Sequence, residues 1–235
     1  MKNKIKISPI KILILCIFLS AIIFILFKFI STSEYFRVQY IITSEKDIRL
    51  DYLKGKSIFG INLKSVFERL NTDYPQHRII RIGIQPPNCI VVKAEKRRPI
   101  AYVRLYRDFA IDSEGVIFPI QEFNPDLPIV LGLENKLGYV KSGYKPKLKE
   151  LQLVIKLIEK FNQIESLKKF KIKKIKVETS FCLSFFMDNI EIKIDEKIEQ
   201  GLNLLLVVLS QLKDELEKVS YIDLRFKEPL VKYER

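Results

Sequence analysis

Histidine and cysteine are scarce in this sequence, and their scarcity limits the chemistry it can carry. Among 235 residues there is one histidine, His77, and there are three cysteines. One histidine cannot build a histidine-rich metal site, and a Ser-His-Asp triad is nearly ruled out. Because His77 follows Pro75 in a segment typical of a loop, we interpret it as an ordinary exposed residue.

The three cysteines do not identify a redox compartment. Cys16 lies within a long apolar run, while Cys89 and Cys182 lie in strand-like segments far apart in the sequence. A disulfide between Cys89 and Cys182 remains open, and two separate buried thiols are the favoured interpretation.

Catalytic motifs are also missing. The sequence contains no activated nucleophile, phosphate-binding loop or cluster of metal ligands. Asp112 and Glu114 form a carboxylate pair that a membrane-anchored hydrolase could use, but residues 112–115 are typical of a tight turn. We therefore expect no enzymatic activity, no cofactor and no bound metal.

Charge is almost absent from one long segment, residues 12–30, where Lys28 is the single charged residue. As a helix, this segment would be about 28 Å long, enough to cross a hydrocarbon core of roughly 30 Å. A cleaved signal peptide is the alternative, but the run is long and no small-x-small cleavage site follows it. The pattern predicts a transmembrane helix at 12–30.

Positive charge before the span predicts its orientation. Four lysines and no acidic residue precede it: Lys2, Lys4, Lys6 and Lys11. By the positive-inside rule, residues 1–11 form a cytoplasmic tail, and the rest of the chain lies outside the cytoplasm. This predicts a single-pass type II protein of the cell inner (cytoplasmic) membrane, despite a few positive charges beyond the span.

The net charge of +13 is unevenly spread along the chain. Residues 141–176 carry twelve lysines against three glutamates. Because this stretch is expected outside the cytoplasm, we do not expect it to bind nucleic acid. Anionic lipid headgroups or wall polymers remain open as ligands, and a solvated lysine-rich face is the favoured interpretation.

The hydrophobic pattern after the span predicts two small α+β units. The first follows the order strand, helix, helix, strand, strand, with elements at 36–42, 47–53, 63–70, 80–84 and 90–92. The second has strands at 100–105, 109–111, 116–118, 129–131, 172–177, 181–187, 190–194 and 221–226, and helices at 146–161 and 198–216. The apolar stripe of the last helix could form a coiled-coil seam, but burial on a sheet is the commoner case.

Five short motifs appear in a fixed order behind the span. They lie at residues 53–59, 86–90, 95–101, 111–118 and 221–226. In this order they resemble the bacterial cell-division family FtsQ/DivIB, and the last motif, YIDLRF, is the most specific. Thr43-Ser44 stands where that family usually has a glycine, Gln76 where an apolar residue is usual, and a glycine is missing near Asp195. These departures affect loop details.

The resemblance implies a fold and a domain division. The fold expected is α+β: an N-terminal transmembrane helix, a small POTRA-like β-α-α-β-β domain at 36–98, and a mixed β-sheet domain with two flanking helices at 99–235. The second of these is the FtsQ-type β domain.

The resemblance also implies a function without catalysis. The chain is expected to be a septal scaffold that links division proteins to septal wall synthesis through extracytoplasmic contacts. Its expected partners are FtsB/DivIC-like and FtsL-like bitopic proteins and other divisome membrane proteins. The alternative is a POTRA-containing assembly or secretion factor, although such proteins carry a C-terminal barrel for which too few strands remain here.

The predicted partner site is the terminal motif, read as the last strand at an edge of the second domain's sheet. A partner could add a strand there through backbone hydrogen bonds. The residues are Tyr221, Ile222, Asp223, Leu224, Arg225 and Phe226. The alternative is that Tyr221 and Leu224 are simply core residues of a last strand.

The predicted topology can be tested with a reporter that is active only after export. Because the lysines before the span retain the N-terminus in the cytoplasm, the reporter fused after Arg235 should be active. Activity of a cytoplasm-only reporter at the same position would contradict both the topology and the function inferred from it.

Overall fold

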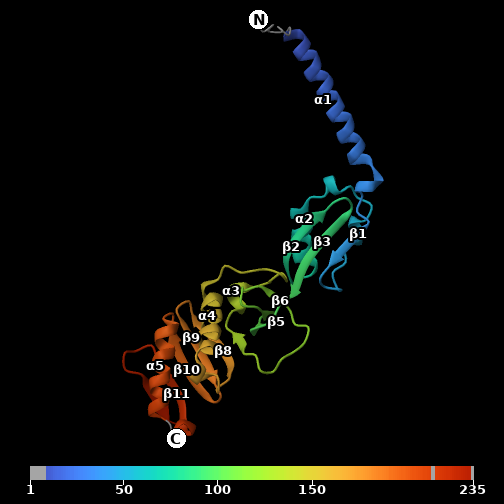
Figure 1. Ribbon diagram of the computed structural model, residues 1–235. Helices are drawn as coiled ribbons and strands as arrows, with labels where there is room; N and C mark the ends of the chain where they lie inside the picture. Colours follow the sequence, from blue (N-terminus) through green and yellow to red (C-terminus); the bar gives the residue numbers. More distant parts are fainter. Residues whose placement is uncertain (1–8, 213–214, 234–235) are drawn as a thin grey trace. The chain divides into compact units, whose positions relative to one another are not determined.

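The computed structural model describes residues 9–212 and 215–233 (Figure 1). The chain forms two compact units: one contains the chain up to Asn71 with Arg78–Glu95, and the other contains Thr72–His77 with Lys96–Arg235. Lys2, Lys4 and Lys6, on which the predicted orientation depends, lie outside the described residues.

Helix α1 (Pro9–Thr32) contains the predicted span. Within it, Ile12–Ile30 is long and apolar enough to cross a membrane, and none of this stretch is buried against the rest of the protein. A helix that is apolar all round requires a nonpolar environment on every side. The predicted membrane-spanning helix is therefore present as a helix of suitable length and composition.

The first domain contains a three-stranded sheet with the order β1-β3-β2, within the described part of the chain. Strand β1 (Tyr40–Thr43) pairs in parallel with β3 (Cys89–Lys96), and β2 (His77–Gln85) lies on the other side of β3. Helix α2 (Leu63–Asp73) buries Val66 and Leu70 in the core, as its apolar spacing predicts.

Two predicted elements at the start of this domain are shorter than expected. Only β1 of the predicted strand 36–42 pairs with the sheet, because Val38 instead exchanges backbone hydrogen bonds with Gly55 and Lys56 in a loop. The predicted helix 47–53 is reduced to one 3-10 turn, Asp51–Leu53. Ile48 and Leu50 are both buried, and side chains two residues apart do not share a helical face.

The interpretation of His77 as an exposed loop residue is wrong. His77 is the first residue of β2 and is fully buried. Strand β2 therefore begins three residues before its predicted start, and the alternation of the strand turns the imidazole inward, near the ring of Tyr74 at 6.4 Å between centroids.

The second domain contains a nine-stranded mixed sheet, counted over the described residues, with the order β12-β11-β10-β9-β8-β7-β4-β5-β6. Three neighbouring pairs are parallel: β10 with β11, β4 with β7, and β7 with β8. The strands are β4 (Ala101–Arg104), β5 (Asp108–Ile111), β6 (Ile117–Pro119), β7 (Ile129–Leu131), β8 (Ile172–Thr179), β9 (Cys182–Met187), β10 (Ile190–Asp195), β11 (Val219–Asp223) and β12 (Leu230–Tyr233).

Two long helices pack side by side on this sheet, as predicted. Helix α4 (Lys149–Gln163) contacts β8 and α5 (Ile198–Gln211) contacts β10, and residues from both helices belong to one buried core. The apolar stripe predicted over 198–216 is buried on the sheet, so it is not a coiled-coil seam. Helix α5 ends at Gln211, and Leu216 belongs to a separate 3-10 turn.

Close approach between α5 and β10 depends on Gly201. A Cβ atom at this position would lie 2.5 Å from the Cδ1 atom of Ile194 on β10, which is too close for two carbon atoms. The absence of a side chain therefore lets α5 lie directly against the strand that precedes it.

Asp112 and Glu114 act in a turn, as the sequence predicts. The Asp112 carboxylate accepts hydrogen bonds from the backbone N–H groups of Glu114 (3.1 Å) and Val116 (2.9 Å). Gly115 has a φ of +83°, which favours glycine. Both carboxylates also bind the guanidinium of Arg97. Their hydrogen bonds are thus used to hold the turn.

One buried ion pair links α4 to its surroundings and should influence stability in acid. Glu150 accepts hydrogen bonds from Lys136 in the short helix α3 (Glu134–Leu137) and from Ser180. These bonds lower the pKa of Glu150 from 4.5 to about 2, with the Lys136 bond the largest cause. Because the folded state prefers the ionised form, this stabilisation is complete above pH 4.5 and is lost as the pH falls toward 2.

We expect Glu150→Gln to lower the free energy of unfolding at pH 7 by about 2 kcal/mol, less than the pKa shift alone implies because Lys136 is partly exposed. Unfolding of the full chain in detergent, followed by circular dichroism between neutral and acidic pH, measures this. The difference between variant and parent should shrink as the pH falls. Glu159→Gln, exposed on the same helix, is the control. Equal effects of the two substitutions would contradict the assignment.

Candidate partner-binding surface

The terminal motif does not form an edge strand. Tyr221, Ile222 and Asp223 belong to β11, which lies between β10 and β12. Leu224, Arg225 and Phe226 follow the strand in the loop toward β12. The prediction that residues 221–226 form the last strand is therefore wrong. The role of residues 221–226 in partner binding stays a prediction.

Among the described strands, β12 is the edge strand at this end of the sheet. It pairs antiparallel with β11, with Leu230 opposite Asp223 and Val231 opposite Ile222. Strand β12 is not among the strands predicted from the sequence, because Pro229, directly before it, is typical of the end of a strand. The signal was nevertheless present: a proline directly before a strand needs no ladder hydrogen bond, and Val231 and Tyr233 have good strand propensity.

Side chains of the terminal motif lie on both faces of the sheet. Ile222 and Leu224 are buried in the core beneath the helices. Tyr221 and Asp223 alternate with them and lie on the opposite face. The alternative that Tyr221 and Leu224 are both core residues is thus correct for Leu224, whereas Tyr221 is half-buried beside polar neighbours.

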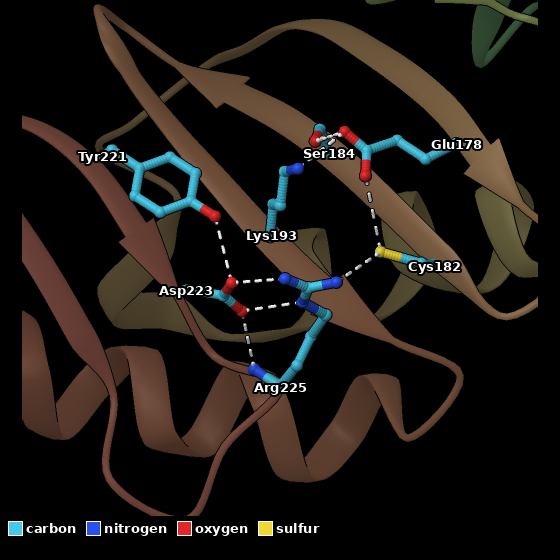
Figure 2. A network of polar contacts seen from close by, with 7 residues as sticks. All are labelled: Glu178, Cys182, Ser184, Lys193, Tyr221, Asp223 and Arg225. Atoms are coloured by element: carbon cyan, nitrogen blue, oxygen red, sulfur yellow. Dashed lines mark hydrogen bonds and ion pairs between the residues drawn. The ribbon is translucent and has the colours of Figure 1, made fainter.

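Asp223 is the centre of a polar network on this face (Figure 2). Its carboxylate accepts hydrogen bonds from Nε (2.8 Å) and Nη2 (2.6 Å) of Arg225 and from the hydroxyl of Tyr221 (3.0 Å). The backbone N–H of Arg225 donates to the same carboxylate at 3.1 Å. The bidentate contact of Nε and Nη2 with the carboxylate fixes the guanidinium of Arg225 in one orientation, immediately before Phe226 in the chain.

The network holds Asp223 in its ionised form. Hydrogen bonds from the Arg225 side chain are the largest cause of a lowered pKa of Asp223, and they outweigh the opposing effect of burial. The pKa of the Tyr221 hydroxyl is raised, first by burial and then by its hydrogen bond to Asp223. At neutral pH the carboxylate is therefore charged and the tyrosine is a hydrogen-bond donor.

The same face carries a second group of polar side chains, on β8, β9 and β10. Glu178 accepts hydrogen bonds from Ser184 (2.8 Å) and pairs with Lys193 (3.0 Å). Burial, the largest single cause, raises the pKa of Glu178. The contacts with Lys193 and Ser184 together outweigh burial, so the net shift of the pKa is downward. Figure 2 shows Cys182 between Glu178 and Arg225; its thiol has weak contacts to both, at 3.8 and 3.9 Å.

Cysteine 182 is a buried free thiol, as is Cys89 in the first domain. Two separate buried thiols were the favoured interpretation, and this is confirmed. Burial is the largest cause of a raised pKa of Cys182, so the thiol is protonated and unreactive at neutral pH. Sequence reasoning missed Glu178, Ser184 and Lys193, because the register of the three consecutive strands β8, β9 and β10 must be set before these side chains meet on one face.

Apolar side chains stand exposed beside the network. Phe226 is 52% exposed and Leu230, at the start of β12, is 57% exposed. A cavity of about 200 Å³ lies beside Phe226, between the loop after β11 and helix α5; its lining includes Lys197, Gly201 and Leu204. Exposed aromatic and aliphatic groups next to a cavity are suited to contact with another protein.

The site has the features of a binding surface. Both carboxylates of the network already pair with a cation, so neither is poised to take a proton. Within residues 9–212 and 215–233, no group of histidine, cysteine, aspartate and glutamate has an arrangement that could hold a metal ion. What the surface offers is backbone at a sheet edge, a fixed guanidinium and exposed apolar side chains.

Comparison with known proteins matches the second domain to a defined family. The family described as "Cell division protein FtsQ/DivIB, C-terminal" matches residues 101–225, just over half of the chain. The matched segment begins with the first residue of β4 and ends at Arg225. It thus includes the whole network around Asp223.

Two curated relatives match most of the chain. To the cell division protein FtsQ of Geotalea daltonii it is 21% identical over 220 residues, which cover 88% of this chain and 78% of that protein. To the cell division protein FtsQ of Syntrophotalea carbinolica it is 23% identical over 204 residues, which cover 81% of this chain and 71% of that protein. Both matches extend beyond the second domain.

The network around Asp223 should be a major determinant of folding at this end of the sheet. Asp223→Ala leaves the Arg225 guanidinium, which is partly exposed, and the Tyr221 hydroxyl without their shared acceptor, so we expect a loss of about 2 kcal/mol in the free energy of unfolding. Glu191→Gln, on the same face of β10, is the matched control and should change it by less than about 1 kcal/mol. Denaturant unfolding of the full chain in detergent measures both. A loss no larger for Asp223→Ala than for the control would show that the network does not support the fold.

Proposed function

Because this chain belongs to the FtsQ/DivIB family of cell-division proteins, we propose that it acts as a non-catalytic scaffold of the division septum. The family match carries this proposal. In this role the protein links early division proteins to septal wall synthesis through contacts made outside the cytoplasm. The domain boundaries proposed are 36–98 for the POTRA-like domain and 99–235 for the FtsQ-type β domain.

The proposed location is the inner membrane at the division site. Helix α1 supplies a single span at Ile12–Ile30, and the lysines before it favour a cytoplasmic N-terminus. Both folded domains then lie outside the cytoplasm. In this arrangement the protein presents a rigid surface to the extracytoplasmic parts of other membrane proteins.

The proposed partners are small bitopic division proteins of the FtsB/DivIC and FtsL types, together with other divisome membrane proteins. The observation that favours a binding mode is the position of β12 at the sheet edge, within the described part of the chain. An edge strand has backbone donors and acceptors along its outer side, so a partner segment can continue the sheet by adding a strand.

Side chains near β12 would give this contact its specificity. Residues 221–226 remain part of the proposed site, with a change in their role. Phe226 and Leu230 offer exposed apolar area, and Arg225 presents a guanidinium whose orientation Asp223 fixes. Tyr221 supports Asp223 from within the sheet and does not itself form the edge.

The alternative, an assembly or secretion factor with a POTRA domain, has no observation in its favour. The second domain is an open mixed sheet with α4 and α5 packed on it, and its strand order begins and ends at β12 and β6. The carboxylates considered for a hydrolase, Asp112 and Glu114, are engaged in a turn and with Arg97.

The proposed surface predicts a specific loss of partner binding. Phe226→Glu combined with Leu230→Glu places two negative charges where apolar contact is expected, so we expect at least a tenfold weaker Kd, about 1.4 kcal/mol, for an FtsB/DivIC-like partner. Binding is measured with the full chain in detergent and the purified partner. Both side chains are exposed, so the domain should remain folded, which thermal melting checks.

The matched control is Phe181→Glu. Phe181 is 56% exposed in the same domain, directly before β9, and does not line the cavity beside Phe226. It should leave the affinity unchanged. If a folded double variant binds the partner as tightly as the parent does, the partner site lies elsewhere on the domain.

A further inference from the structure

Three aromatic side chains gather where the chain enters the first domain after α1. Tyr35 and Phe36 lie in the 3-10 turn Glu34–Phe36, and their rings are in edge contact at 5.2 Å between centroids. Phe59, from the 3-10 turn Ile58–Gly60, packs on Phe36 at 5.4 Å. The cluster therefore joins the segment after the span to a separate loop of the folded domain.

These aromatic side chains are largely exposed. Tyr35 is 63% and Phe59 is 54% exposed, and Phe36 is half-buried between them. The core of the first domain lies deeper, at residues such as Val38 and Ile58, which are buried. The cluster is thus an apolar surface added outside a core that is already complete.

The link between α1 and the cluster is short and ordered. The N–H of Ser33 donates to the carbonyl oxygen of Phe29, in the last turns of α1, at 3.0 Å. The side chain of Ser33 then caps the next turn by accepting a hydrogen bond from the N–H of Tyr35 at 3.3 Å. Few flexible residues therefore separate the span from the aromatic cluster.

The cluster is also fixed to the body of the domain. Val38 donates its N–H to the carbonyl oxygen of Lys56 and accepts from the N–H of Gly55, both at 2.9 Å. Arg37 and Ser57 form an antiparallel bridge between the same two segments. These contacts hold the segment that leads into Phe59 beside the segment that carries Phe36.

We propose that Tyr35, Phe36 and Phe59 form a membrane seat that inserts into the interfacial layer of the outer leaflet and holds the first domain against the bilayer. The proposal rests on α1 being a membrane span, as in the proposed function. Its occupant is the lipid surface itself, because only residues 31–34 separate the cluster from the apolar stretch that ends at Ile30.

Distance supports this assignment. Tyr35 is the fifth residue after Ile30, the end of the apolar stretch. Two of these residues continue α1, Ser33 is extended and a 3-10 turn follows, so the path covers no more than roughly 10 Å. The headgroup layer on each side of the hydrocarbon core is roughly 5–8 Å thick. Tyr35 therefore reaches the interfacial layer, where aromatic side chains of membrane proteins are enriched.

Charge beside the cluster fits the same surface. Arg37 and Lys56, on the two segments that carry Phe36 and Phe59, are exposed. Lys54 pairs with Asp51 at 2.7 Å, and one acidic residue, Glu34, is exposed in the turn that carries Tyr35. Basic side chains flanking an apolar surface can contact lipid phosphates while the rings lie deeper. Apolar rings flanked by exposed basic side chains, here Arg37 and Lys56, are typical of surfaces that bind at a membrane interface.

The chain contains no tryptophan, so one introduced tryptophan gives an unambiguous fluorescence signal. In the full chain reconstituted into phosphatidylcholine vesicles, Phe59→Trp should emit at shorter wavelength than an exposed tryptophan. It should also lose emission when the acyl chains carry bromine. Tyr35→Trp should behave in the same way, and it provides a second reporter at an exposed position if Phe59→Trp perturbs the loop.

Two control variants separate the possible outcomes. Phe24→Trp, in the middle of α1, should be quenched if the span is inserted, and Phe181→Trp, exposed in the second domain, should not be quenched. A quenched Phe24→Trp with unquenched Phe59→Trp and Tyr35→Trp overturns the membrane seat and leaves the anchor intact. An unquenched Phe24→Trp overturns the anchor itself, and with it the seat. Quenching of Phe181→Trp equal to that of Phe59→Trp would show nonspecific contact and also overturn the seat.

Discussion

The parallel pairing of β10 with β11 is the constraint on which the proposed binding surface depends. Two parallel neighbours cannot be joined by a tight turn, so the chain must cross the sheet between them, and α5 makes this crossing. The apolar stripe of α5 makes the crossing favourable because it is buried on the sheet, and Gly201 permits close packing against Ile194. With β11 in place, Lys193 lies opposite Asp223, and β12 pairs on the outer side of β11.

A charged network at this point has a physical cost and a physical benefit. Asp223 is almost fully buried, and a buried carboxylate is tolerated only when it is paired and hydrogen-bonded. Arg225 and Tyr221 supply those bonds, and the result is a guanidinium held in one orientation beside Phe226. Binding surfaces gain affinity when their groups are ordered before the partner arrives, since less conformational entropy is lost on association. The network thus connects the stability of the sheet end to its proposed use in partner binding.

The two domains use exposed apolar residues for different proposed contacts. In the first domain, aromatic side chains follow the span directly and are fixed by backbone hydrogen bonds between residues 37–38 and 55–57, which suits a lipid surface. In the second, Phe226 and Leu230 lie beside an edge strand, which suits another polypeptide. The distinction comes from the local backbone. A strand edge has a row of backbone donors and acceptors that another peptide segment can match. A lipid interface has no such row, and aromatic side chains with polar neighbours are suited to it.

Local patterns in the sequence determined the span, the two long helices, most of the strands and the turn at Asp112, because these depend on hydrophobic periodicity and turn chemistry within a few residues. The family motifs indicated the α+β fold class, which the structure has. Tertiary structure alone decided that His77 is buried, that β12 covers β11, and that Asp223 meets Arg225 beside Glu178 and Lys193. Strand order and burial depend on pairing between segments distant in the chain, and a strand's own sequence does not specify whether another strand lies beyond it.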